Sequence, residues 1–355
     1  MMSFKFADIQ RGKLAPVVRL ISRGFCLATT FRNALYDRRI LPVHPSSLPV
    51  ISVGNLSVGG SGKTPLVRAV CSILKEGGQS PVVLIRGYKG KEPGPYKVNP
   101  KEDTAEKVGD EALMLSQDFT VVVARDRFAG ARYIERESLG SVIILDDGFQ
   151  HRRLVRDLNI LCIDASTKDA VDDLVLNRVL PYGRLRESFS DGISRADIVV
   201  LSFREQSADA ERYKTIKSAL PKGIKTYVST YKVKAIKSLA GGAPLEGKQC
   251  KGMQCVAMCG IANPEGFKST LMRHGLELKG WFAYPDHYAF QEKEIKGIAQ
   301  RYPDIPIVCT EKDGVKLRHL SASLLSKIYV VHISAEIDPF PEFQSAINAT
   351  LRHQG

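Results

Sequence analysis

Long apolar runs are missing from this sequence of 355 residues. No stretch reaches the roughly 18 uncharged apolar residues that a membrane-spanning helix needs. Near the N-terminus, Arg19 and Arg23 interrupt the apolar residues that would have to form the hydrophobic core of a signal peptide. We therefore expect neither a transmembrane protein nor a secreted precursor.

Cysteine is also scarce, with seven residues that lie mostly alone inside apolar runs. The single cluster, Cys250, Cys255 and Cys259, lacks the CxxC spacing that zinc sites favour, and no histidine follows at ligand spacing. An odd number of dispersed cysteines is typical of reduced, buried thiols in a cytosolic protein. A disulfide framework and a zinc site are not expected.

Glycine, at 29 residues, is too rare for a collagen-like chain, and the hydrophobic (44%) and charged (25%) fractions are those of a globular protein. A chain of this length is expected to form two domains. Positive charge is in excess, because 51 Lys and Arg against 38 Asp and Glu give a net charge of +13. Such a surface favours nucleic acid, anionic lipid headgroups or phosphorylated substrates, and charge alone does not choose among them.

The N-terminal segment concentrates this charge. Eight basic and two acidic side chains give residues 1–40 a net charge of +6, nearly half of the total. Apolar residues recur at helical spacing from Leu14 to Leu35, with Arg19 and Arg23 opposite them. The pattern predicts an amphipathic helix, which either lies in an anionic membrane surface or packs on the protein's own core.

Short apolar strands alternate with helical stretches from residue 49 onward. The expected strands are 50–53, 82–85, 120–124, 142–145, 159–163 and 197–201. This alternation predicts an α/β fold with a parallel sheet covered by helices on both faces. We expect an N-terminal helix at 1–48, the main domain at 49–228, a linker or hairpin at 229–252, and a smaller α/β domain at 253–355.

A glycine-rich segment between the first strand and the next helix is the strongest motif. It reads Ser57, Val58, Gly59, Gly60, Ser61, Gly62, Lys63 and Thr64. This is a P-loop in the required context, so the parallel sheet is expected to be P-loop NTPase-like. Lys63 would reach the β- and γ-phosphates, and the Thr64 hydroxyl would bind Mg²⁺. Ser57 departs from the strict pattern, which has glycine there; the alternative is an ordinary glycine-rich turn.

A second motif resembles a Walker B strand. Four apolar residues at 142–145 end in Asp146 and Asp147, with Gln150 and His151 soon after. An aspartate at the carboxyl end of a strand can hold Mg²⁺ directly or through water. The alternative is a turn after a buried strand.

Three weaker segments carry polar residues, and each has a structural alternative. Gly109-Asp110-Glu111 opens a helix, where Asp110 could simply be a cap, and Asp286-His287 could be a surface loop. The stretch 180–187, which contains Arg186 and Glu187, could bind phosphate, reach a metal or form a solvated loop.

The segment 310–313, Thr-Glu-Lys-Asp, follows a strand, but its Lys and Asp are adjacent, which is the wrong spacing for the guanine-reading segment of GTPases. ATP is therefore the expected nucleotide.

Together these segments resemble one family, the tetraacyldisaccharide 4'-kinases, which are the lipid A 4'-kinases of Gram-negative bacteria. The matching segments occur in the family's order and span about residues 49–317: 51–64, 86–88, 108–112, 145–151, 180–187, 260–264, 286–288 and 310–313. The family tolerates Ser at position 57. Asn263 stands where Arg is common, and Gly266 stands where a bulkier residue is usual.

The resemblance implies transfer of the γ-phosphoryl group of ATP to the 4'-hydroxyl of tetraacyldisaccharide 1-phosphate, which gives lipid IVA. It also implies a peripheral enzyme on the cytoplasmic face of the inner membrane, with an anionic lipid substrate. This location favours the membrane-surface interpretation of the N-terminal helix. No obligate protein partner is expected.

The resemblance further implies that Asp110 is the general base, with His287 as its partner across a domain cleft. The same site would be lined by Arg86, Glu111, Asp146, Asp147, Gln150, His151, Arg186 and Glu187. We assign Mg²⁺ to Thr64 with an acid among Asp146 and Glu187.

Two competing functions fit less well. A nucleic-acid-binding P-loop ATPase predicts aromatic residues clustered among basic ones, and the sequence shows no such cluster, so nucleic acid is not an expected partner. A metal-insertion GTPase is disfavoured by the spacing at 310–313.

Overall fold

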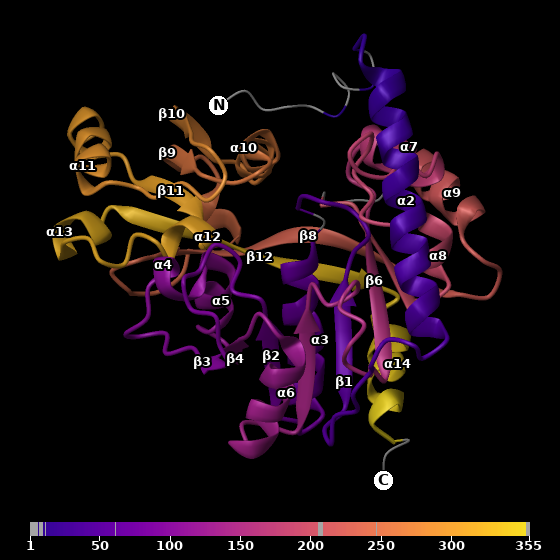
Figure 1. Ribbon diagram of the computed structural model, residues 1–355. Helices are drawn as coiled ribbons and strands as arrows, with labels where there is room; N and C mark the ends of the chain where they lie inside the picture. Colours follow the sequence, from indigo (N-terminus) through magenta and orange to yellow (C-terminus); the bar gives the residue numbers. More distant parts are fainter. Residues whose placement is uncertain are drawn as a thin grey trace. The chain divides into compact units, whose positions relative to one another are not determined.

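The computed structural model describes residues 6, 10, 12–60, 62–204, 209–245 and 247–352 (Figure 1). The chain forms two compact units. The first holds the described residues up to Arg86, Ala124–Tyr231 and those from Ala335 on, and the second holds Gly87–Val123 and Lys232–Ser334.

The first unit is built on a parallel sheet in the order β8-β7-β6-β1-β5-β2. Its strands are β1 (Val50–Gly54), β2 (Pro81–Ile85), β5 (Val142–Asp146), β6 (Leu158–Asp164), β7 (Ile198–Ser202) and the first half of β8 (Lys225–Ser238). Every residue of β1, β2, β5 and β7 is buried. Because successive side chains of a strand point to opposite faces, both faces of this sheet are covered. The predicted fold class is confirmed.

Helices supply that cover. They are α2 (Ala15–Asp37), α3 (Lys63–Glu76), α6 (Arg127–Arg136), α7 (Lys168–Val175), α8 (Phe189–Ile193), α9 (Ala210–Ala219) and α14 (Phe340–Arg352). Helix α3 buries Leu66, Val70 and Leu74 at helical spacing. One core cluster joins Leu161 of β6 and Val199 of β7 to residues of α7 and α9.

The second unit contains the strand order β10-β9-β11-β12, in which neighbouring strands pair in parallel. These strands are β9 (Gln254–Cys259), β10 (Glu277–Ala283), β11 (Ile307–Thr310) and β12 (Ile328–Asp338). The strands β3 (Tyr96–Lys97) and β4 (Thr120–Val123) pair antiparallel. Its helices are α4 (Ala105–Val108), α5 (Asp110–Leu115), α10 (Pro264–Arg273), α11 (Glu292–Arg301), α12 (Glu311–Gly314) and α13 (Ala322–Leu325), with a 3-10 turn at Gly247–Cys250.

The division of the chain differs from the expected boundaries in three places. The residues from Ala335 on, expected in the smaller C-terminal domain, belong to the first unit. Gly87–Val123, expected inside the main domain, belongs to the second unit. Residues 229–238, expected in a linker, continue strand β8, and Ile236 forms an antiparallel bridge with Leu245. Around Val233, exposed lysines alternate with buried residues. This two-residue period is typical of a strand with one exposed face. The hairpin alternative describes this stretch better than a linker does.

The cysteines match their expectation. All seven are free thiols, and all but Cys26 are buried. Burial raises the pKa of Cys255 to about 12, so this thiol stays protonated and unreactive.

Candidate active site

The P-loop leads from β1 into α3 within the first unit, and Gly62 shapes its end. Gly62 caps α3 with φ of +85°, a conformation that L side chains rarely adopt. A Cβ atom there would lie 2.3 Å from Ser202 Oγ and 2.4 Å from Tyr231 Oη. Only glycine therefore fits, and the chain enters α3 at Lys63 with backbone N–H groups free for an anion at the helix N-terminus. Ser61, part of the predicted motif, lies outside the described residues.

The start of the P-loop is held by the segment that carries Arg184 and Arg186. Ser57 forms an antiparallel bridge with Leu185. The Val58 N–H donates to the Arg184 carbonyl at 2.9 Å, and the Arg186 N–H donates to the Leu56 carbonyl. Ser57 thus sits in a strand-like pairing that needs no glycine. Two motifs that lie far apart in the sequence, at 57–64 and 180–187, become one structure.

Asp147 forms ion pairs with both Lys63 and Arg186. Its backbone has φ of +50°, rare for a residue other than glycine, and its N–H donates to the Val53 carbonyl at 3.0 Å. Arg186 Nη1 donates to both carboxylate oxygens at 2.9 Å, and Lys63 Nζ lies 3.5 Å from Oδ1. Burial would raise the pKa of Asp147, but Lys63 and Arg186 outweigh burial and hold that pKa below its usual value. The structure thus gathers three of the predicted residues around one carboxylate.

Glu187 has a different environment from the one expected of a metal ligand. Its side chain is fully buried and accepts hydrogen bonds from Asn33 Nδ2 at 2.7 Å and Gln150 Nε2 at 3.1 Å. Arg195 forms an ion pair with it at 2.7 Å. Gln150 also donates to the Asn55 carbonyl at 2.8 Å. Both oxygens of Glu187 accept hydrogen bonds, so this carboxylate ties α2 to the loops beside the P-loop, and its assignment to Mg²⁺ stays a prediction.

Two further arginines, Arg86 and Arg127, lie near the adjacent aspartates Asp146 and Asp147. Arg127, at the start of α6, is buried, and burial followed by the charge of Arg86 lowers its pKa, while Asp147 and Asp146 act in the opposite direction. Burial and the charge of Arg127 also lower the pKa of His151 to about 4, so His151 is neutral at pH 7. The sequence analysis missed Arg127, although it follows a predicted strand end in the run 125–127, Arg-Asp-Arg.

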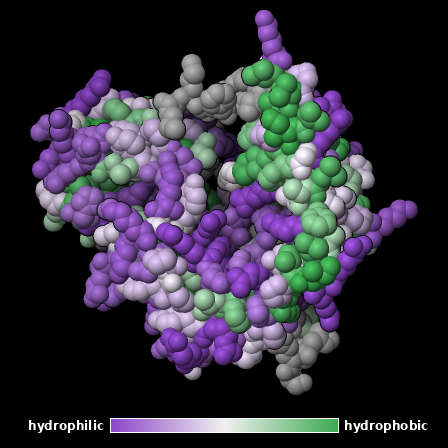
Figure 2. All heavy atoms as spheres, in the orientation of Figure 1, coloured by the Kyte–Doolittle hydropathy of each residue, from purple (hydrophilic) through white to green (hydrophobic). Residues whose placement is uncertain are grey.

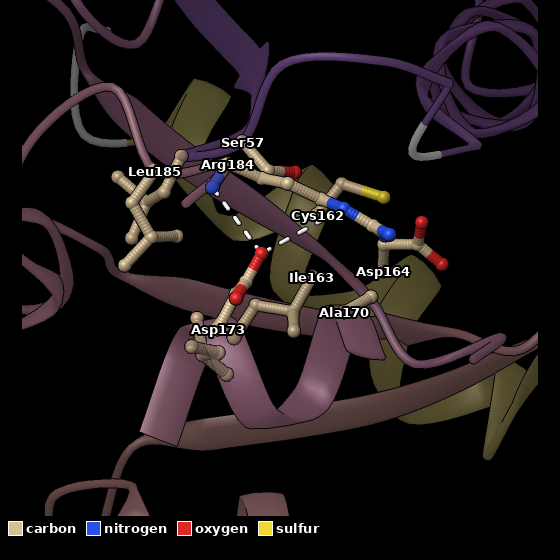
Figure 3. Close-up of a pocket in the computed structure, with 10 residues that line it drawn as sticks. Ser57, Cys162, Ile163, Asp164, Ala170, Asp173, Arg184 and Leu185 are labelled. Carbon is tan, nitrogen blue, oxygen red and sulfur yellow. Dashed lines mark hydrogen bonds and ion pairs between the residues drawn. The ribbon is translucent and has the colours of Figure 1, made fainter. Parts of the chain in front are cut away.

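A small pocket next to the P-loop is closed by an internal ion pair (Figure 3). Asp173 points from α7 toward Arg184, whose Nε lies 3.7 Å from its carboxylate and whose backbone N–H donates to it at 3.3 Å. Ser57 and Leu185 line the same pocket. The Arg184–Asp173 pair thus joins the segment 180–187 to α7 beside the P-loop.

In the second unit, Asp110 and His287 are in direct contact. Asp110 opens α5, and Gly109 before it has φ of +90° and no room for a Cβ, which would lie 2.8 Å from the Tyr88 carbonyl oxygen. The Asp110 carboxylate accepts from the Glu111 N–H at 2.9 Å and lies 2.7 Å from His287 Nδ1. The side chains of Asp110 and His287 are 6% and 12% exposed.

The charge state of Asp110 follows from these contacts. Burial would raise its pKa, but the hydrogen bond from His287 and the charge of Lys312 lower it further than burial raises it. Asp110 is therefore a carboxylate at neutral pH. Its expected pairing with His287 across a domain cleft is corrected in one respect: both residues belong to the second unit, because Gly87–Val123 packs with Lys232–Ser334.

The remaining predicted residues lie beside these groups. Thr64 follows Lys63 in the first turn of α3, and Asp146 ends β5, where it is paired in register with Val53 of β1. Glu111 follows Asp110 in α5, and its Oε1 lies 3.8 Å from Lys312 Nζ. Lys312 was considered in the sequence only for guanine recognition, so its place beside Asp110 was missed.

Comparisons with known proteins identify the family of this chain. The family model described as tetraacyldisaccharide-1-P 4'-kinase matches residues 14–352. Tetraacyldisaccharide 4'-kinase of Pelobacter propionicus is 35% identical over 328 residues, covering 89% of this chain and 87% of that protein. The enzyme of the same name from Rhodospirillum centenum is 34% identical over 310 residues, covering 86% of this chain and 85% of that one.

A solved structure is similar along nearly the whole chain. LpxK from Aquifex aeolicus, described as a complex with ATP, is 28% identical and superposes with a TM-score of 0.76, covering 94% of this chain and 98% of that one. The family resemblance expected from the sequence is confirmed. This chain belongs to the tetraacyldisaccharide 4'-kinase family.

Proposed function

We propose that this protein transfers the γ-phosphoryl group of ATP to the 4'-hydroxyl of tetraacyldisaccharide 1-phosphate, giving lipid IVA in lipid A biosynthesis. The observation that carries the proposal is the Gly62–Lys63 entry into α3 in a chain of this family. The Aquifex aeolicus relative, described with ATP, supports the choice of nucleotide. Phosphoryl transfer needs little covalent chemistry from the protein, so the residues act mainly by positioning and by charge.

On the phosphate side, Lys63 is the central cation. In the structure its ammonium faces Asp147, which is also held by Arg186. Phosphate oxygens at the N-terminus of α3 would draw Lys63 toward them, while Arg186 keeps Asp147 in place. Arg86 and Arg127 add positive charge near the paired aspartates, which suits a nucleotide triphosphate.

Thr64 and Asp146 are suited to hold Mg²⁺. A hydroxyl and a carboxylate are the hard oxygen donors that this ion prefers, and Mg²⁺ usually takes one or two carboxylates with substrate phosphates and water. The described residues contain no cluster of three or more His, Cys, Asp or Glu placed to hold a metal, which fits this sparse protein ligation. When bound, the ion would neutralise charge on the transferred phosphoryl group.

On the acceptor side, we propose Asp110 as the general base. It is ionised, nearly buried and held by two donors, the Glu111 N–H and His287 Nδ1. A carboxylate in this state can take the proton of the 4'-hydroxyl as the bond to phosphorus forms.

Helix α2 supports a peripheral location on a membrane. Its buried residues are polar, Ser22, Thr29 and Asn33, and they face the protein through contacts such as Ser22 Oγ to the Val179 carbonyl. Large apolar side chains point outward instead, among them Leu20 (67% exposed), Leu27 (72%) and Phe31 (66%). Figure 2 shows patches of hydrophobic surface along this helix.

This arrangement is the reverse of a helix that packs its apolar stripe on the core, so that alternative from the sequence is wrong for α2. An exposed apolar band with basic residues such as Arg19 and Arg23 suits an anionic lipid surface, where the substrate also resides. Among the described residues, no helix is long and apolar enough to cross a membrane. We propose that α2 holds the protein on the cytoplasmic face of the inner membrane of a Gram-negative cell.

Replacing Leu20, Leu27 and Phe31 together by Asp is expected to reduce binding to vesicles of anionic and zwitterionic lipid by at least roughly tenfold. Each fully buried Leu or Phe contributes about 1.5–3 kcal/mol, and insertion in a lipid surface buries part of that. The three side chains are exposed, so the fold should survive. Vesicle co-sedimentation measures the effect.

The matched control replaces three exposed apolar residues outside α2, Val155, Val175 and Leu176, by Asp. It should bind vesicles as the unchanged protein does. Equal binding by all three proteins would contradict a membrane role for α2.

The reaction itself is tested with purified protein in detergent micelles. Radiolabelled ATP and tetraacyldisaccharide 1-phosphate should give a labelled lipid whose phosphate is at the 4' position. Product that depends on ATP and acceptor together supports the function. Failure to label this acceptor, with nucleotide binding intact, would contradict the proposed substrate.

A further inference from the structure

We propose that Lys312 is a positioning residue that holds His287 in a single tautomer, with the proton on Nδ1, so that Asp110 is the terminal base and His287 relays no proton. This inference rests on the proposed role of Asp110. Everything it uses lies in the second unit.

The first observation is a hydrogen bond on the far side of the imidazole ring from Asp110. Lys312 Nζ lies 3.2 Å from His287 Nε2, while His287 Nδ1 lies 2.7 Å from Asp110 Oδ2. An ammonium donates and never accepts, and Asp286 Oδ2, at 3.7 Å from Nε2, is too far to accept a hydrogen bond from it, so Nε2 is the acceptor. The one proton of a neutral imidazole then belongs on Nδ1, where Asp110 accepts it.

Lys312 remains an ammonium in this position. Its side chain is 17% exposed, and burial would lower its pKa, but Asp110, Glu111 and Asp286 outweigh burial and raise it. Asp286 Oδ1 lies 3.3 Å from Nζ, and the carboxylates of Asp110 and Glu111 each lie 3.8 Å away. The charge of Lys316 also lowers the pKa of Asp110.

The turn that carries Lys312 also holds the loop of His287. Asp313, fully buried, accepts from the Gly260 N–H at 3.1 Å and from Thr310 Oγ1 at 2.7 Å. The Gly260 carbonyl in turn accepts from the His287 N–H at 3.1 Å. His287 has φ of +62°, so its backbone occupies a conformation that needs such support. The sequence 310–313, which does not fit a guanine site, thus fixes His287 from two sides.

A consequence for proton transfer follows. When Asp110 takes the proton of the acceptor hydroxyl, an imidazole with a free Nε2 could pass a proton onward from its other nitrogen. Because Lys312 Nζ already donates to Nε2, a second proton on His287 would place an N–H of the imidazole against an N–H of the ammonium. The proton therefore stays on the Asp110 carboxyl until it leaves for solvent, and the Nδ1–H of His287 only orients that carboxyl.

The test uses full-length protein with ¹⁵N-labelled histidine. In the unchanged protein, the ring nitrogen shifts of His287 should show a protonated Nδ1 and an unprotonated Nε2. Lys312→Met removes the ammonium and keeps most of the stem, so Nε2 should become partly protonated. Lys312→Arg, which keeps a donor and a charge, should retain the Nδ1–H tautomer.

The pH profile gives a second readout. Lys312 contributes to the lowered pKa of Asp110, so its removal raises that pKa, and Asp110 becomes protonated at pH values where it is normally free. The acid limb of kcat/KM should therefore move to higher pH by about one unit in Lys312→Met. Lys296→Met is the matched control, because Lys296 pairs with Glu292 on the surface of α11, and it should change neither readout.

The ring spectra are read without turnover, so they judge this inference even if the proposed kinase activity fails. A proton on Nε2 in the unchanged protein would overturn it. So would a folded Lys312→Met protein, checked by circular dichroism, whose tautomer and acid limb are those of the unchanged protein.

Discussion

Lys63→Met is expected to lower kcat for phosphoryl transfer by on the order of 10³-fold. Lys63 is the first residue of α3, where the helix N-terminus and the P-loop amides would meet the β- and γ-phosphates. Methionine keeps the length of the side chain but supplies no charge to the transferring phosphoryl group. Initial-rate assays in micelles, with ATP and lipid acceptor saturating, measure the loss.

The fold should survive this change, because Arg186 still donates to both oxygens of Asp147 when Lys63 is gone. Lys75→Met is the control, since Lys75 lies in the last turn of the same helix, remote from the loop. Its kcat should match that of the unchanged protein. A folded Lys63→Met protein with nearly unchanged kcat would show that the P-loop assignment is wrong.

Local motifs were the part of this site that the sequence could predict. A P-loop needs only a strand, a short run of glycines and a helix start, and all three are adjacent in the chain between β1 and α3. The strand before Asp146 was predicted for the same reason, since four consecutive apolar residues form it. Motifs contained within about ten consecutive residues can be predicted because the sequence itself shows the local structure that they need.

Contacts between distant segments were not predictable in this way. Glu187 was expected to bind metal, but its surroundings are set by Asn33 on α2 and by Arg195, neither of which is marked by any local pattern. The proximity of Asp110 and His287 came from the family resemblance, and spacing alone could not supply it. The assignment of Gly87–Val123 to the second unit depends on packing that only three-dimensional structure shows.

Helix α2 illustrates a different gap. Periodicity predicted its amphipathic character but could not say which face turns inward, because a helix on a membrane and a helix on a core have the same spacing. The answer lies in polar contacts such as Ser22 Oγ to the Val179 carbonyl and Thr30 Oγ1 to Asp191 Oδ2. These contacts bind the polar face to the protein and leave the apolar face exposed.

The Asp110–His287 pair gives the second large effect. Asp110→Asn should lower kcat by on the order of 10²-fold or more, because the amide cannot take the acceptor proton. Asparagine keeps the side-chain oxygen that accepts from the Glu111 N–H, so the start of α5 should remain intact. His287→Ala should also lower kcat, because the carboxyl of Asp110 loses the donor that orients it. ATP affinity should barely change in either variant.

The double variant decides whether the two residues act as a unit. If they do, its loss of kcat should be much smaller than the product of the two single losses, because His287 has nothing to orient once Asp110 is an amide. Since both residues lie in the second unit, their contact needs no movement of one unit toward the other, and it should be present without nucleotide or lipid. His319→Ala, an exposed histidine of the same unit, is the control and should keep full activity. Multiplicative losses in the double variant, or an Asp110→Asn protein with full activity, would rule out the pair as the acid–base machinery.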